Sequence, residues 1–97
     1  MEKKKSIVEE LKLDPVSING IRLRKEDEEK LVDYLKICFD QGCSKGELIG
    51  RVTDDYMDNL KYRDFVDCNG NSVDLKTLQS IVRAYYEQID QKFGTDD

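Results

Sequence analysis

An amphipathic helical pattern in the last quarter of the chain is the feature that most constrains the fold. Five apolar side chains follow one another at positions i, i+3, i+4, i+7 and i+11, namely Leu78, Ile81, Val82, Tyr85 and Ile89. This spacing places them on one face of a helix, and Asp74 is of a type that caps a helix N-terminus. We therefore predict a helix from Asp74 to Phe93 that must bury one face against the rest of the chain.

Two further helices are predicted upstream. Apolar residues recur at helical spacing at Leu31, Leu35 and Cys38. They predict a helix over about 25–41, which Gly42 ends in the left-handed conformation. Ser44 and Glu47 have the spacing of a capping box, which opens another helix. The core face of that helix would consist of Leu48, Ile49, Val52, Tyr56 and Leu60.

Two Asn-Gly pairs, at 19–20 and 69–70, lie between short apolar runs. Asn and Gly tolerate the positive φ angles that a type I′ hairpin turn requires. We predict short β-hairpins at Val16-Leu23 and at about Arg63-Val73. A helix over 1–13 would precede them, and because it is short it must dock on the rest of the protein or fray.

The sequence thus predicts an α+β, mainly helical fold of about four helices and one or two short β-hairpins around a single core. Its 97 residues suit a single domain over 1–97, with a disordered tail at 94–97. Superposing the Asn-Gly pairs places Leu31 over Ile81 and Val32 over Val82. The matched identities are too few to distinguish a duplication from two uses of one common device.

Charge limits the partners that this chain can bind. Acidic residues outnumber basic ones by 21 to 16, a net charge of −5. A negative surface repels nucleic acid and anionic membranes, so we expect a protein partner with a basic surface. No apolar run is long enough to span a bilayer, and no signal-peptide stretch follows the lysines at 3–5. With three cysteines, an odd number typical of a reducing compartment, this predicts a cytoplasmic protein.

The chain contains no histidine, so it lacks the commonest general base and the usual partner of Ser and Cys nucleophiles. Zinc in a closed site needs four ligands, which three cysteines cannot supply. The loop 65–76 has the polar spacing of a calcium loop, but Phe65 and Lys76 stand where its first and last carboxylates belong. We therefore predict no catalytic, cofactor-binding or metal-binding residues, and a protein that is not an enzyme.

Residues Phe39 to Leu60 have the spacing of a helix-turn-helix. Gly42, Ser44 and the following Glu47-Leu48-Ile49 resemble the Gly-x-Ser-x-x-Glu-Ile segment of many bacterial DNA-binding domains. The helix that would read DNA nevertheless carries three carboxylates, at Asp54, Asp55 and Asp58, which would repel phosphate. We keep a DNA-binding regulator as an alternative, and a plain helical hairpin explains the same residues.

Acidic blocks without catalytic residues favour a small protein-interaction module, a regulator or inhibitor that binds a basic surface of a larger protein. A phage or mobile element is one source that we consider for such a protein. A homodimeric assembly protein is a third alternative, because Tyr86 and Phe93 lie off the main apolar stripe. The predicted partner contacts are Glu26, Asp27, Glu28, Glu29, Asp54, Asp55, Tyr56, Asp58 and Tyr62.

Overall fold

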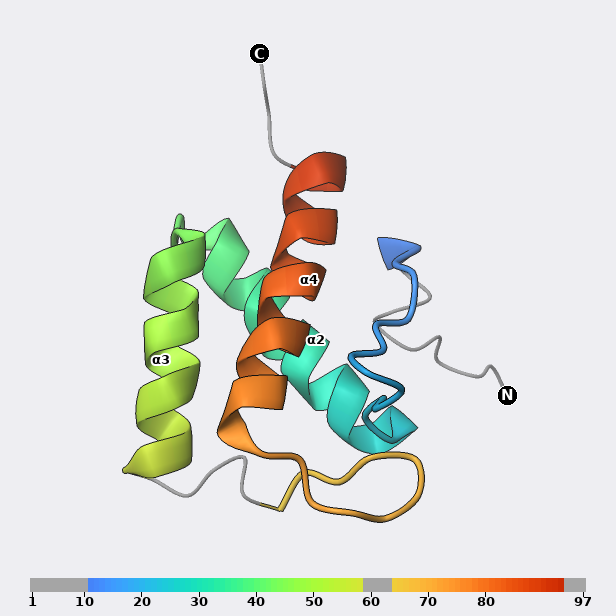
Figure 1. Cartoon of the computed structure of the whole chain (residues 1–97). Coiled ribbons are helices and arrows are strands. Elements are labelled where there is room, and N and C mark those ends of the chain that lie inside the picture. The colour runs from blue at the N-terminus through green and yellow to red at the C-terminus, as the bar shows by residue number, and fades with distance from the viewer. Residues whose placement is uncertain (1–10, 59–63, 94–97) are drawn as a thin grey trace, which may run out of the picture.

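The computed structural model describes residues 11–58 and 64–93, and within these ranges the chain forms three helices and no strand (Figure 1). They are α2 (Lys25–Asp40), α3 (Lys45–Met57) and α4 (Leu75–Phe93). Helix α4 packs against both α2 and α3. Each helix buries one stripe of apolar side chains, which is the arrangement expected when amphipathic helices share one core.

The fold predicted from the sequence, four helices with one or two β-hairpins, is wrong for the described residues. Around Asn19 and Gly20 the chain does turn with positive φ angles of 53° and 82°. Ile18 and Ile21 exchange backbone hydrogen bonds of 2.9 and 2.8 Å, but this single bridge does not extend into strands. Of the helix predicted over 1–13, residues 1–10 lie outside the described ranges, and so does the tail 94–97.

The second predicted hairpin, Arg63-Val73, is likewise reduced to one bridge, between Val66 and Ser72; residues 59–63 lie outside the described ranges. Its first arm pairs instead with the segment before α2, because Leu23 and Asp67 form an antiparallel bridge. Two hydrogen bonds flank this bridge, from the Arg24 amide to the Val66 carbonyl (3.1 Å) and from the Cys68 amide to the Arg22 carbonyl (2.9 Å). An isolated two-stranded hairpin is marginally stable in water. Pairing between the segment before α2 and the segment around Asp67 therefore stabilises both.

The core lies between the three helices. Helix α4 buries the five residues of its predicted apolar stripe, Leu78, Ile81, Val82, Tyr85 and Ile89. Helix α2 contributes Leu31, Val32, Leu35 and Cys38, and α3 contributes Leu48 and Val52. Leu13, Val16 and Leu23 add apolar side chains from the segment before α2. In the described part of the chain no helix is both long and apolar enough to cross a membrane.

Helix α2 ends in a Schellman motif, which turns the chain sharply into α3. Gly42 has a φ of 88°, a left-handed conformation that glycine adopts without steric cost. Its amide donates to the Phe39 carbonyl, and the Cys43 amide donates to the Cys38 carbonyl, both at 3.0 Å. These two bonds define the motif, and they fix where the next helix starts.

Helix α3 begins with the predicted capping box. The Glu47 amide donates to the Ser44 hydroxyl at 3.1 Å, and the Ser44 amide donates to a Glu47 carboxylate oxygen at 3.0 Å. Two amides at the helix start are thereby satisfied. The helix ends at Met57 with Asp58 as its C-cap, whereas Leu60, the last predicted core residue of this helix, lies outside the described ranges.

Candidate functional site

The predicted contacts at the start of α2 divide into exposed and buried carboxylates. Glu26 is 76% exposed and forms an ion pair of 3.6 Å with Arg24 at the surface. Glu29 is half-buried. Asp27 and Glu28, by contrast, are only 2% and 3% exposed. A carboxylate so deeply buried must be paired within the fold, and each of these two has a basic partner.

Glu28 is held by three side-chain donors. Arg22 donates through Nε (3.3 Å) and Nη2 (3.2 Å), and the Tyr85 hydroxyl of α4 donates at 2.6 Å. The hydroxyl of Tyr85 in turn accepts a 3.2 Å bond from the Val16 amide. Burial and the bond to Glu28 raise the pKa of Tyr85, and the same carboxylate raises the pKa of Arg22. This network joins α2, α4 and the segment before α2.

Asp27 joins α2 to the loop that precedes α4. Its carboxylate accepts a 2.8 Å bond from Arg24 Nε and a 3.0 Å bond from the Val66 amide. Figure 1 shows this loop passing beneath the N-terminal end of α2. Asp67 is also buried. Its side chain holds the tip of the loop by accepting hydrogen bonds from the backbone N–H groups of Asn69 and Asn71 at 2.8 and 2.9 Å.

Asp27 and Glu28 therefore serve the interior of the domain and present no carboxylate to a partner in this structure. The sequence contains a signal that Glu28 is buried. It precedes Leu31 and Val32 by three and four residues, which places it on the apolar face of the helix. A charged residue on that face needs a partner, and only the fold reveals that Arg22 and Tyr85 provide it.

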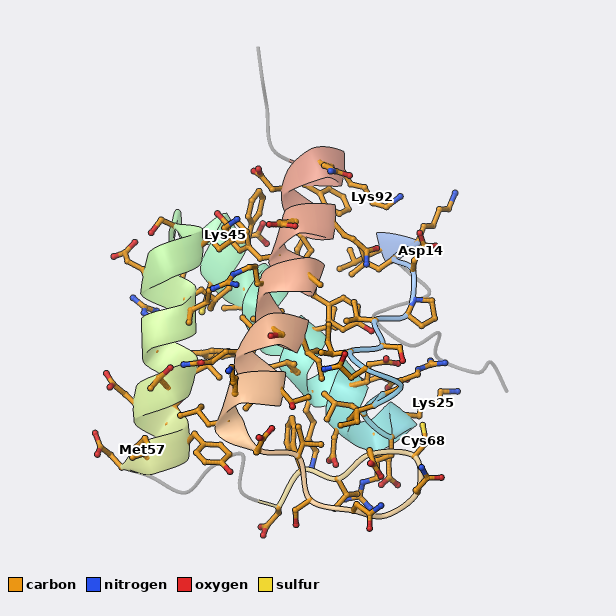
Figure 2. The ribbon with its side chains drawn as sticks, viewed as in Figure 1. Asp14, Lys25, Lys45, Met57, Cys68 and Lys92 are labelled. Atoms are coloured by element: carbon orange, nitrogen blue, oxygen red, sulfur yellow. The ribbon has the colours of Figure 1, made fainter. Side chains whose placement is uncertain are left out.

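The acidic residues of α3 lie mainly on its outer side. Asp54 and Asp58 are exposed, as is Glu47 at the start of the helix. Met57 is 53% exposed, and Figure 2 shows it at the opposite end of α3 from Lys45. Helical spacing places Glu47, Asp54 and Asp58 on one side of the helix. We call Glu47, Asp54, Met57 and Asp58 the α3 acidic face.

The other predicted contacts of α3 are less accessible. Asp55 and Tyr56 are half-buried, and Tyr56 packs against the core. Burial raises the pKa of Tyr34 on α2, and the negative charge of Asp55 adds a smaller contribution in the same direction. Tyr62 lies outside the described residues. The structure thus brings together Asp54 and Asp58 and turns Asp55 and Tyr56 partly inward.

Arg51 and Lys45 are the basic residues of α3, and both have partners within the chain. Arg51 Nη1 lies 3.8 Å from the sulfur of Cys38. Lys45 Nζ forms a 2.8 Å ion pair with Glu87 on α4. The ion pair with Glu87 offsets the charge of Lys45, and the α3 acidic face itself carries three carboxylates. For this helix to read DNA, these carboxylates would have to approach phosphate.

Tyr86 and Phe93, which suggested a homodimer, contact α2 of their own chain. The Tyr86 hydroxyl donates to the Cys43 carbonyl at 3.0 Å, and its ring meets that of Phe39 edge-to-face at 5.7 Å between centroids. Lys36 Nζ lies 5.0 Å from the centroid of the Phe93 ring, within the range of a cation–π contact. Phe93 remains 44% exposed. Their position off the apolar stripe thus has an explanation within one chain.

Among residues 11–58 and 64–93, no three His, Cys, Asp or Glu side chains are grouped so that they could hold a metal ion. No protein-family model, curated protein sequence or solved structure matches this chain. A function must therefore be argued from the exposed residues themselves, and the α3 acidic face is the most distinctive group among them.

Proposed function

We propose that this chain is a non-enzymatic protein-interaction module that docks its α3 acidic face on a basic surface of a larger protein. The exposed carboxylates Asp54 and Asp58 would steer the encounter and fix its register, and Met57 between them would supply apolar contact area. Charge complementarity speeds association and selects partners, and methionine is enriched in protein interfaces. Regulation or inhibition of that larger protein is the proposed outcome.

The position of the carboxylates within α3 carries this proposal. Asp54, Asp55 and Asp58 lie at the C-terminal end of the helix, where no basic residue accompanies them in the last turn. The helix dipole makes this end partially negative, so carboxylates here are unfavourable for folding and lysines would be favourable. Residues that cost stability without forming part of the core are often kept for function.

One pair of substitutions on α3 should change binding and stability in opposite directions. Exchanging Asp54 and Asp58 for lysine should weaken binding of the partner. The same exchange should slightly increase the stability of the folded chain, because lysine is favourable at the C-terminal end of a helix. The matched control exchanges Asp33 and Asp90, exposed carboxylates of α2 and α4, for lysine. It changes the net charge by the same amount and leaves α3 intact.

The partner would be trapped with a photo-crosslinking methionine analogue at position 57. We expect one protein to be captured in cells and its crosslinked peptide to be rich in Lys and Arg. Capture should fall for the Asp54/Asp58 variant, persist for the Asp33/Asp90 control, and weaken as salt rises. Equal capture by both variants would contradict the proposal. Salt-sensitive binding of mixed-sequence duplex DNA by the unmodified chain would support the DNA-binding alternative in its place.

A further inference from the structure

The turn between α2 and α3 places two cysteines at the two positions that a Schellman motif brings together. Cys38 is the third residue from the end of α2, and Cys43 directly follows the left-handed Gly42. The Cys43 amide donates to the Cys38 carbonyl at 3.0 Å, so the two backbones are held side by side. In this motif the side chains of these two positions commonly touch.

The two thiols lie in one buried cluster. Cys38 is 1% and Cys43 is 7% exposed, and both belong to the same buried core. A disulfide requires Cα atoms about 4.4–6.8 Å apart with Cβ atoms facing one another. The 3.0 Å hydrogen bond between the backbones of the same two residues is compatible with that requirement.

Arg51 supplies the positive charge that thiol chemistry needs. Its Nη1 lies 3.8 Å from the sulfur of Cys38, and its charge also acts on Cys43. A guanidinium beside a sulfur favours the thiolate, which is the nucleophile in disulfide exchange. Burial works in the opposite direction and raises the pKa of Cys43.

We propose that Cys38 and Cys43 form a redox-active dithiol that closes reversibly to a disulfide by exchange with a small disulfide such as oxidised glutathione. Cys43, the more exposed of the two, attacks the reagent first, and one glutathione leaves with the proton that Cys43 gives up. The sulfur of Cys38, beside Arg51, then attacks the Cys43 sulfur of the mixed disulfide and releases the second glutathione, which takes the remaining proton. Two thiols are oxidised and one glutathione disulfide is reduced to two thiols.

This inference is independent of the proposed docking function, because it uses the inner side of the α2–α3 turn. Cys68 provides an internal contrast, since it is exposed and its thiol donates to the Leu23 carbonyl at 3.6 Å. Exchange of Cys68 with glutathione should stop at the mixed disulfide. Exchange at the pair should proceed to closure and release both glutathiones.

The test uses the full chain with Cys68→Ser. The protein is equilibrated over a series of ratios of oxidised to reduced glutathione. Exchange is then quenched with acid, free thiols are alkylated, and the products are measured by mass spectrometry. We expect a species lighter by two hydrogen atoms whose peptide map links positions 38 and 43. The same titration in concentrated urea gives the equilibrium constant of disulfide closure for the unfolded chain. The folded chain should close with an equilibrium constant about tenfold larger or more, because the turn holds the sulfurs together.

Arg51 is tested by the rate of closure in the same background. Arg51→Gln should slow closure several-fold and Arg51→Lys should restore most of the rate, while Arg83→Gln, at an exposed arginine of α4, should leave it unchanged. Circular dichroism confirms that each variant is folded. The proposal is overturned if the folded chain keeps both thiols free in excess oxidised glutathione, accumulates only mixed disulfide, or closes no more readily than the chain in urea.

Discussion

The hydroxyl of Tyr85 on α4 donates a 2.6 Å hydrogen bond to the carboxylate of Glu28 on α2, 57 residues earlier in the chain. Arg22, in the segment before α2, donates two further hydrogen bonds to the same carboxylate. Helix α4 thus meets the start of α2 and the segment just before it at one buried charge. Such a charge is expensive to leave unpaired, so the relationship predicts large effects from small changes.

Replacing Glu28 by Gln should lower the free energy of unfolding by about 2–3 kcal/mol, because Arg22 then loses its charged partner while the shape of the side chain is kept. Urea denaturation followed by circular dichroism measures this. The matched control is Glu26→Gln at the exposed surface pair, which should leave the stability almost unchanged. Equal losses in the two variants would show that the buried network contributes nothing beyond a surface ion pair.

Stability should also depend on pH through Tyr85. Its pKa is raised above the ordinary value of 10.0 by burial and by the bond to Glu28, so the folded chain keeps a proton that the unfolded chain loses. The contribution of this group is therefore complete below about pH 10 and is lost as pH rises further. Urea titrations between about pH 8 and pH 11 should show this decline.

Tyr85→Phe serves as the comparison for that pH series. The variant should be less stable at neutral pH by about 1–2 kcal/mol, because the Val16 amide and the Glu28 carboxylate each lose a partner. Its decline at high pH should be shallower than that of the unmodified chain. Some decline should remain, because burial raises the pKa of Tyr34 and Tyr86 as well. Parallel pH profiles would rule out this role for Tyr85.

Two glycine substitutions should change stability in opposite directions. Gly42→Ala forces a side chain into a φ of 88° at the end of α2 and should cost about 1 kcal/mol. Gly50→Ala, within α3 and with nothing within 4 Å of the added methyl group, should stabilise by about 0.5–1 kcal/mol. Thermal unfolding of both variants decides this. A gain for Gly42→Ala would mean that the Schellman turn is not formed as described.

Ser44→Ala removes the side-chain half of the capping box at the start of α3. The Glu47 amide loses its 3.1 Å acceptor, and the expected loss of stability is about 1 kcal/mol. Ser17→Ala, at an exposed position in the segment before α2, should have little effect and serves as the control. If both variants melt at the temperature of the unmodified chain, the cap is not formed in solution.

Local rules account for the parts of the fold that were predicted correctly. Positions 78, 81, 82, 85 and 89 share a helix face by geometry alone, and all five are buried. The capping box at Ser44 and the left-handed Gly42 depend on residues within five positions of one another. The turn at Asn19-Gly20 likewise formed where it was predicted. In each case the interacting atoms are neighbours in sequence, so the sequence specifies them directly.

The burial of the acidic block at the start of α2 was only partly predictable from the sequence. As a run of four carboxylates it resembled an exposed surface, yet Asp27 and Glu28 are buried. Charge alone does not distinguish a solvated carboxylate from a paired one, because the difference lies in partners elsewhere in the chain. On α3, by contrast, Asp54 and Asp58 are exposed as a polar helix face would suggest.

The sequence by itself thus determined the three helices, their apolar faces and the turn that joins α2 to α3, since each depends on contacts within a few residues. Only the tertiary structure decided that the arms of the two predicted hairpins pair with each other at Leu23 and Asp67, and that Glu28 meets Arg22 and Tyr85. The physical reason is that a hydrogen bond between distant segments depends on how the helices pack, which no short stretch of sequence specifies. The position of Glu28 on the apolar face of its helix can be read from the local sequence, but its pairing with the Tyr85 hydroxyl of α4 cannot.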